Sequence, residues 1–157
     1  MKLQILAVGK ARVPYFAAGI DEYIKRIRHY LPIEQVEVPE GTGGDSNGHG
    51  SGAVSREGEK LSRLLRPGTR LVTLEATGRQ FTSEALSEWL QKEMAGSTER
   101  IAFVIGGAWG IDKQLTEAAH LKLSLSSMTF PHELARMMLL EQLYRALTLW
   151  KGHPYHK

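Results

Sequence analysis

Cysteine is absent from this 157-residue chain, and its absence excludes several kinds of site at once. Without a thiol, the chain can form no disulfide, no thiolate zinc site, no iron–sulfur cluster and no cysteine nucleophile. Long hydrophobic runs are also lacking, which argues against a membrane span, and the opening Met1-Lys2-Leu3 does not begin a secretory signal. We therefore expect a cytoplasmic protein with no metal centre and no membrane association.

The chain also lacks a strong excess of charge of either sign. Its 20 Lys and Arg residues oppose 17 Asp and Glu residues, which leaves a net charge of +3. This mild positive charge suits a polyanionic partner without proving one. The densest basic segment, residues 25–30, is compatible with nucleic-acid contact and equally with a solvated helix face.

Apolar patterning predicts an alternation of strands and helices. Strands are expected at residues 3–8, 33–38, 71–74, 101–105 and 121–125. Helices are expected at residues 13–30, 56–65, 83–94, 112–119 and 133–150, with Ser83 and Asp112 as N-caps. The glycine-rich segment 40–55 is expected to be a flexible loop. This order predicts a single α/β domain over residues 1–157, with a parallel sheet and helices on both faces.

Small residues follow three of the expected strands. Gly106 and Gly107 come directly after one strand, and Ser126 and Ser127 follow another. Glycine and serine let main-chain groups approach a ligand closely. In parallel sheets ligands bind beyond the carboxyl ends of the strands, so the loops after Leu74, Ile105 and Leu125 predict one pocket for a nucleotide-like ligand.

The last expected helix is apolar around most of its circumference. A single contact with the core would require only one apolar stripe. The pattern therefore favours burial on two sides, against the sheet and against a second copy in a homodimer. The alternative is a helix that the chain's own segments cover.

Several motifs together resemble those of one family. They are Met1-Lys2-Leu3-Gln4, Arg56 to Leu61, Phe103 to Gly107, Leu123 to Ser126, Thr129-Phe130-Pro131-His132, Leu139 to Ala146 and His153-Pro154-Tyr155-His156-Lys157. In these segments the chain resembles the small SPOUT-class methyltransferases, specifically the RlmH family, which methylates N3 of a pseudouridine in large-subunit (23S) ribosomal RNA. The similarity extends over nearly the whole chain.

The resemblance implies a fold, a cofactor and an assembly. The family's sheet is threaded at its C-terminal part as a trefoil knot, a feature that spacing could not have revealed because knots are rare. S-adenosylmethionine is the implied cofactor, and the enzyme is implied to be a homodimer with substrate bound across the subunit interface. Carried over to this chain, the cofactor contacts are Leu74, Gly107, Ser126, Ser127, Met128, Thr129, Phe130 and Pro131.

One segment departs from the family pattern. Related sequences carry lysine and arginine after the Pro39 turn, whereas Gly41 to Ser55 contains neither. If that segment normally contacts RNA phosphates, the charge must come from elsewhere. The basic residues between Lys25 and His29 and the C-terminal tail are the candidates.

Methylation of a uracil-like N3 requires that its proton leave and that the resulting anion be stabilised. His153 is the first candidate for the base because an unperturbed imidazole titrates near neutrality, and His156 is the second. Arg145 would stabilise the anion or hold a phosphate, with an ion pair to Glu141 as the alternative. Tyr155 would stack on a base.

Two other functions stay open from the sequence. The chain could be a related SPOUT methyltransferase that acts on tRNA, or a nucleotide- or RNA-binding module without catalysis. Since a chain of this length has no appended RNA-binding domain, an assembled ribosome is the expected substrate of the leading interpretation.

Overall fold

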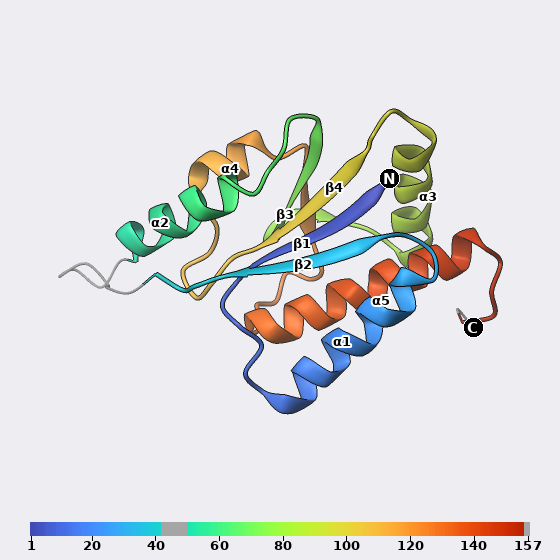
Figure 1. Ribbon diagram of the computed structural model, residues 1–157, viewed down its shortest axis with the longest axis horizontal. Coiled ribbons are helices and arrows are strands. Elements are labelled where there is room, and N and C mark those ends of the chain that lie inside the picture. Colours follow the sequence, from blue (N-terminus) through green and yellow to red (C-terminus); the bar gives the residue numbers. More distant parts are fainter. Residues whose placement is uncertain (42–49, 156–157) are drawn as a thin grey trace.

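Five parallel strands form the centre of the fold (Figure 1). The computed structural model describes residues 1–41 and 50–155. The elements, in chain order, are β1 (Lys2–Val8), α1 (Pro14–Arg28), β2 (Ile33–Val38), α2 (Ser51–Ser62), β3 (Thr69–Gln80), α3 (Ser83–Ala95), β4 (Arg100–Ile105), α4 (Lys113–Ala118), β5 (Leu121–Ser124) and α5 (His132–Trp150). Within the described residues, no helix is both long and apolar enough to cross a membrane.

The strands lie in the order β2-β1-β4-β3-β5, and every neighbouring pair is parallel. Parallel neighbours require crossover connections, and the helices between successive strands supply them. All carboxyl ends therefore lie along one edge of the sheet. The expected α/β class with a parallel sheet is confirmed.

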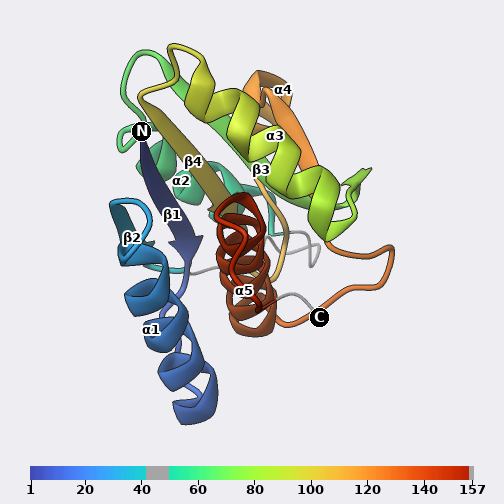
Figure 2. The same cartoon turned by 90° about the vertical axis from the view of Figure 1, so that its right-hand side faces the viewer.

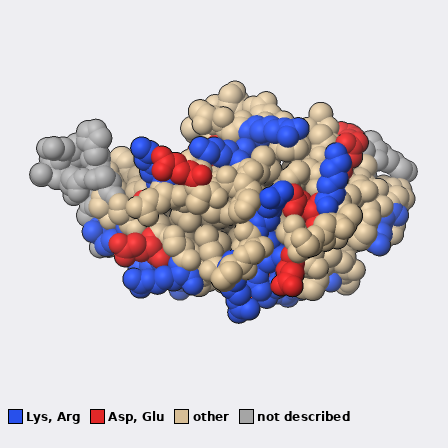
Figure 3. All heavy atoms as spheres, turned by 90° about the horizontal axis from the view of Figure 1, so that it is seen from above, with Lys and Arg blue, Asp and Glu red and all other residues tan. Residues whose placement is uncertain are grey.

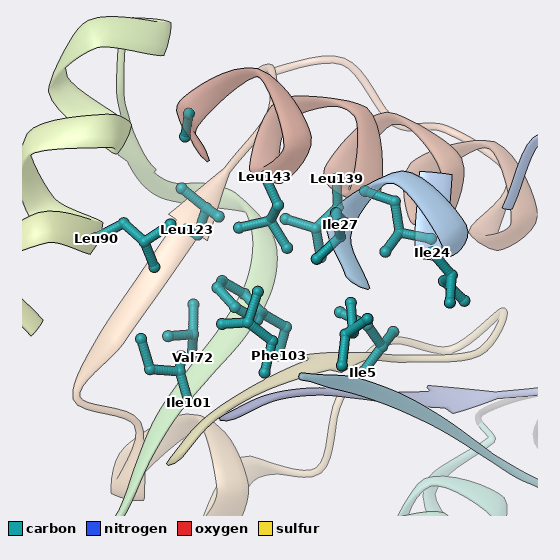
Figure 4. Packing of buried hydrophobic residues seen from close by; sticks show 14 of the residues in the cluster. Ile5, Ile24, Ile27, Val72, Leu90, Ile101, Phe103, Leu123, Leu139 and Leu143 are labelled. Carbon is teal, nitrogen blue, oxygen red and sulfur yellow. The ribbon is translucent and has the colours of Figure 1, made fainter. Parts of the chain in front are cut away.

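Alternating side chains build one hydrophobic layer on each face of the sheet. Leu3, Ile5 and Ala7 of β1 face the layer that α1, α3 and α5 cover, together with Phe103 of β4 (Figure 4). Leu6 and Val8 face the opposite layer, which α2 and α4 cover. The expectation of helices on both faces is therefore correct.

The bounds of two elements and the cap of a third differ from what the sequence predicts. Helix α2 begins at Ser51, so residues 51–55 are helical, while residues 42–49 of the expected flexible loop lie outside the described residues. Tertiary packing outweighs the poor helix propensity of glycine here, since Ala53 is fully buried. Thr82, not Ser83, caps α3, because its hydroxyl accepts a hydrogen bond from the Ala85 N–H at 3.1 Å. Asp112 caps α4 as expected.

The third error concerns β3, which continues to Gln80 instead of ending at Leu74. Leu74 and Arg79 both align with Leu123 of β5, so residues 75–78 loop out of the ladder. The interruption explains why the strand looks short in the sequence. It also places residues 75–77 above the end of the sheet.

Helix α5 lies between α1 and α3 on one face of the sheet (Figure 2). Every residue from His132 to Trp150 is buried or half-buried within the single chain. The chain's own elements thus account for much of the apolar circumference that suggested a second copy. A groove of about 190 Å³ remains on the outer side, lined by Tyr23, Met137, Met138, Glu141 and Gln142.

Arg136 anchors the start of α5 to the ends of β1 and β2. Its side chain is completely buried, and its guanidinium donates to Glu37 Oε1 and to the Gly9 carbonyl at 2.7 Å. The carboxylate of Glu133, which also lies at the start of α5, accepts from the Val13 N–H at 3.0 Å. Burial opposes ionisation of Glu133, but hydrogen bonds from the Val13 and Arg12 backbone prevail and lower its pKa.

We predict that Arg136→Met destabilises the protein by about 3 kcal/mol, because it leaves a buried carbonyl and a carboxylate without their partner. This figure is at the low end for a buried pair, since the Glu37 side chain is 24% exposed. The variant should unfold at a lower temperature, with Tm reduced by roughly 6–12 °C. Arg63→Met, which removes an exposed pair with Glu59, is the matched control and should leave Tm unchanged. Equal Tm values for the two variants would contradict the prediction.

Candidate functional site

The segment of β3 that loops out after Leu74 meets the loops after β4 and β5 in one cavity, so the three segments that the sequence singles out lie together. Its volume is about 600 Å³, which is within the range of pockets for small ligands and cofactors. The lining residues are Leu74, Glu75, Ala76, Thr77, Ile105, Gly106, Gly107, Ala108, Gly110, Ile111, Thr116, Leu125, Ser126, Met128, Thr129, Phe130, Pro131, His132 and Ala135.

Serine side chains hold two of these loops together. The buried Ser124 hydroxyl lies 2.9 Å from the Ala76 carbonyl and 3.0 Å from the Ser126 carbonyl. The Ser126 hydroxyl accepts from the Met128 N–H at 3.0 Å, which tightens the turn after β5. These hydroxyls therefore shape the wall of the cavity through contacts within the protein.

The glycines after β4 are required by close approach. A Cβ atom at Gly106 would lie 2.4 Å from the Gly110 carbonyl oxygen, and one at Gly107 would lie 2.9 Å from Val8 Cγ1. Only the absence of a side chain lets the loop fold back on itself beside β1. The backbone of the loop is thereby exposed to the cavity.

Seven of the eight predicted cofactor contacts line the cavity. Ser127 is the exception, since it is exposed in the same loop but does not line the wall. Sequence reasoning missed Thr116 and Ala135, which reach the cavity from α4 and α5. No motif marks them, because their place depends on how those helices pack.

A second group of predicted residues gathers around Glu141. Arg145 Nε donates to Glu141 Oε1 at 3.0 Å, so the ion pair considered from the sequence is present. The Tyr155 hydroxyl donates to the same oxygen at 3.2 Å, and the Arg145 guanidinium lies 4.9 Å from the centre of the Tyr155 ring. Burial, a hydrogen bond with Tyr23 and the nearby Glu141 raise the pKa of Tyr155, which therefore remains protonated.

His153 lies beside this group and contacts the end of α1. Its Nδ1 is 2.6 Å from the Tyr30 hydroxyl, although the two residues are 123 positions apart. The imidazole is otherwise exposed. His156, the second candidate base, lies outside the described residues.

The cavity and the C-terminal group lie at opposite ends of α5 (Figure 1). His132 lines the cavity from the first turn of the helix, whereas Arg145 is 13 residues further along. At 1.5 Å per residue this separation is roughly 20 Å along the axis. Within one chain, the structure does not bring the predicted catalytic residues to the predicted cofactor contacts.

The surface charge does not by itself mark a single binding face. On the face seen in Figure 3, basic side chains cover more of the surface than acidic ones, which lie at a few places between them. Lys25, Arg28 and His29 are exposed at the end of α1 that also carries the C-terminal tail. Across residues 1–41 and 50–155, no cluster of His, Cys, Asp and Glu could hold a metal ion.

Comparison with known proteins identifies relatives over the whole chain. Residues 1–156 match the model of a family described as predicted SPOUT methyltransferase. A protein from Acetivibrio thermocellus named ribosomal RNA large subunit methyltransferase H is 42% identical, with 100% of both chains aligned. Its namesake from Parabacteroides distasonis is 38% identical, with 99% of each chain aligned.

A solved structure shares the fold at much lower sequence identity. It is that of a probable methylase family protein from Haemophilus influenzae, with a TM-score of 0.54 and 15% identity. The match covers 99% of this chain and 70% of that one. At this identity the similarity supports the fold and nothing finer.

Proposed function

The chain belongs to the SPOUT methyltransferase family, and from this premise we propose that it methylates N3 of a pseudouridine in large-subunit (23S) ribosomal RNA with S-adenosylmethionine as donor. The observation that supports this proposal most directly is the cavity that the looped-out residues 75–77 of β3 form together with the loops after β4 and β5. Relatives named for a large-subunit rRNA methyltransferase align along their full length, which supports the same substrate class.

The cavity fits S-adenosylmethionine in size and in chemistry. Leu74, Ile105 and Phe130 offer apolar surface for an adenine ring, while the loop of Gly106 and Gly107 offers main-chain groups. Glu75 lines the same cavity, and its carboxylate accepts from the Thr73 hydroxyl at 2.6 Å. When bound, the donor supplies an electrophilic methyl group on a sulfonium.

The C-terminal group would serve the methyl acceptor. His153 would take the proton from N3, and Arg145 would stabilise the anion that forms. Tyr155, held in place by Glu141 and by the Tyr144 ring at 4.7 Å, would stack on a base. The neighbouring cations of α1, Lys25 and Arg28, would contact RNA phosphates.

A homodimer reconciles the separation of these two groups. Because they lie at opposite ends of α5, one complete site needs the cavity of one protomer and the tail of its partner. The half-exposed groove between α1 and α5, with Met137 and Met138 in its wall, supports an interface there. Symmetric dimers repeat such a contact twice, which gives two composite sites.

The proposal includes the knotted backbone of the family. Residues 125–131 lead from the edge strand β5 back to α5 and share the cavity wall with residues 74–77 and 105–111. The shared cavity wall supports the proposal that the C-terminal part is threaded as a trefoil knot. The whole chain would then act as one SPOUT domain on cytoplasmic ribosomes.

Transfer of a labelled methyl group tests the proposed function directly. The protein is incubated with labelled S-adenosylmethionine and, in parallel, with ribosomes that lack the modification, with free 23S rRNA and with tRNA. We expect label at N3 of one pseudouridine on the ribosome. Label in tRNA would favour the related tRNA enzyme, and donor binding without transfer to any RNA would favour a non-catalytic module.

Gly106→Ala tests the cofactor cavity. The added Cβ would meet the Gly110 carbonyl at 2.4 Å, and backbone atoms cannot move aside without changing the loop. We expect donor affinity in calorimetry to fall roughly 10- to 100-fold. Gly96→Ala is the control, since its Cβ would find nothing closer than 3.5 Å. An unchanged affinity in Gly106→Ala would refute this placement of the donor.

A further inference from the structure

Two independent anchors fix the position of His153. Its backbone belongs to the turn that ends α5, where the His153 N–H donates to the Thr148 carbonyl at 2.9 Å and the Gly152 N–H to the Leu149 carbonyl at 3.1 Å. Gly152 has φ +66°, the left-handed conformation that this helix ending requires. The side chain is then held by the Tyr30 hydroxyl.

Tyr30 is itself held in place. Its backbone N–H donates to the Ile27 carbonyl at 2.8 Å, and its ring packs edge-on against the Tyr144 ring, with the centroids 6.0 Å apart. Burial and the nearby Tyr144 raise the pKa of Tyr30, so the phenol stays neutral. A neutral phenol retains oxygen lone pairs that accept a hydrogen bond.

We propose that Tyr30 is a positioning residue that accepts a hydrogen bond from His153 Nδ1–H and thereby leaves the Nε2 lone pair open to the substrate. This inference rests on the proposed role of His153 as the base. The hydrogen bond made by one ring nitrogen determines whether the other nitrogen carries a proton. After Nε2 takes a proton, Nδ1 still carries its hydrogen, so the same contact serves both protonation states.

The tautomer is measurable without any activity assay. In ¹⁵N-histidine-labelled protein at a pH where the ring is neutral, we expect His153 to carry its proton on Nδ1. In Tyr30→Phe it should shift towards the Nε2–H form that predominates in free histidine, while the ring packing on Tyr144 is kept. His153→Ala assigns the signal by its disappearance. An Nε2–H ring in the wild type, or the same tautomer in both proteins, would overturn the proposal.

Kinetics provide the second arm of the test. Tyr30→Phe should lower kcat about tenfold, the effect of one lost hydrogen bond at its upper range, with KM and donor affinity unchanged. Tyr15→Phe removes a phenol hydroxyl from an exposed tyrosine of α1 and should leave kcat unchanged. If His153→Ala is inactive while Tyr30→Phe keeps wild-type kcat, the positioning role is wrong and the proposed function stands. If His153→Ala is fully active, the proposed base is wrong and the role of Tyr30 falls with it.

Discussion

Replacement of His153 by alanine should lower the turnover number roughly 100- to 10,000-fold, the range that a positioned general base contributes. Donor binding should be unaffected, because His153 is not among the residues that line the cavity that would hold S-adenosylmethionine. Single-turnover methylation of unmodified ribosomes measures the first effect, and calorimetry with the donor measures the second. Wild-type turnover in His153→Ala would contradict the assignment.

Arg145→Ala is also expected to lower the turnover number while donor binding is unaffected, but for a different reason. It removes the cation that would stabilise the N3 anion, and it also leaves Glu141 without its ion-pair partner. Arg145→Lys keeps the charge but cannot reproduce the planar guanidinium that lies over Tyr155. Partial activity in the lysine variant would indicate that charge matters, whereas equal loss in both variants would indicate that the stacked geometry matters.

Mixed dimers should restore activity to two variants that have little activity alone when the donor is held near the dissociation constant of the wild-type protein. One protomer carries Gly106→Ala, which damages its cavity, and the other carries His153→Ala, which removes the base from its tail. If each site combines the cavity of one protomer with the tail of the other, one of the two sites in the heterodimer is intact. The heterodimer, isolated through two different affinity tags, should then show about half the wild-type rate.

The reciprocal heterodimer is the control for this experiment. It pairs a wild-type protomer with a protomer that carries both substitutions. In composite sites each cavity or tail then meets a damaged partner, so this heterodimer should be inactive. If sites form within single chains, the outcomes reverse: the first heterodimer is inactive and the second keeps half the rate.

Much of the architecture follows from local patterns. Alternation in β1 and β4 separates Leu3, Ile5 and Phe103 from Leu6 and Val104, and this separation predicts two covered faces. The three loops at strand ends predict one cavity because parallel strands place their carboxyl ends together. Six of the eight predicted cofactor contacts are consecutive, from Ser126 to Pro131, and seven of the eight line the cavity wall.

Local sequence patterns do not predict features that depend on packing between distant segments of the chain. The start of α2 is hidden by glycine-rich composition, and the continuation of β3 is hidden by the residues that loop out of it. Thr116 and Ala135 reach the cavity only because α4 and α5 dock against the sheet. The contact between Tyr30 and His153 has no signal in the sequence, since it joins the ends of two helices 123 residues apart.

The sequence by itself determined the order of strands and helices, the α/β class and the loops that form the cavity. These depend on periodicity, turn residues and strand polarity, which act over a few residues. Only the tertiary structure decided that the C-terminal group lies roughly 20 Å along α5 from that cavity, and that Tyr30 holds His153. Such relations depend on the length of α5 and on its packing between α1 and α3, which no local pattern encodes.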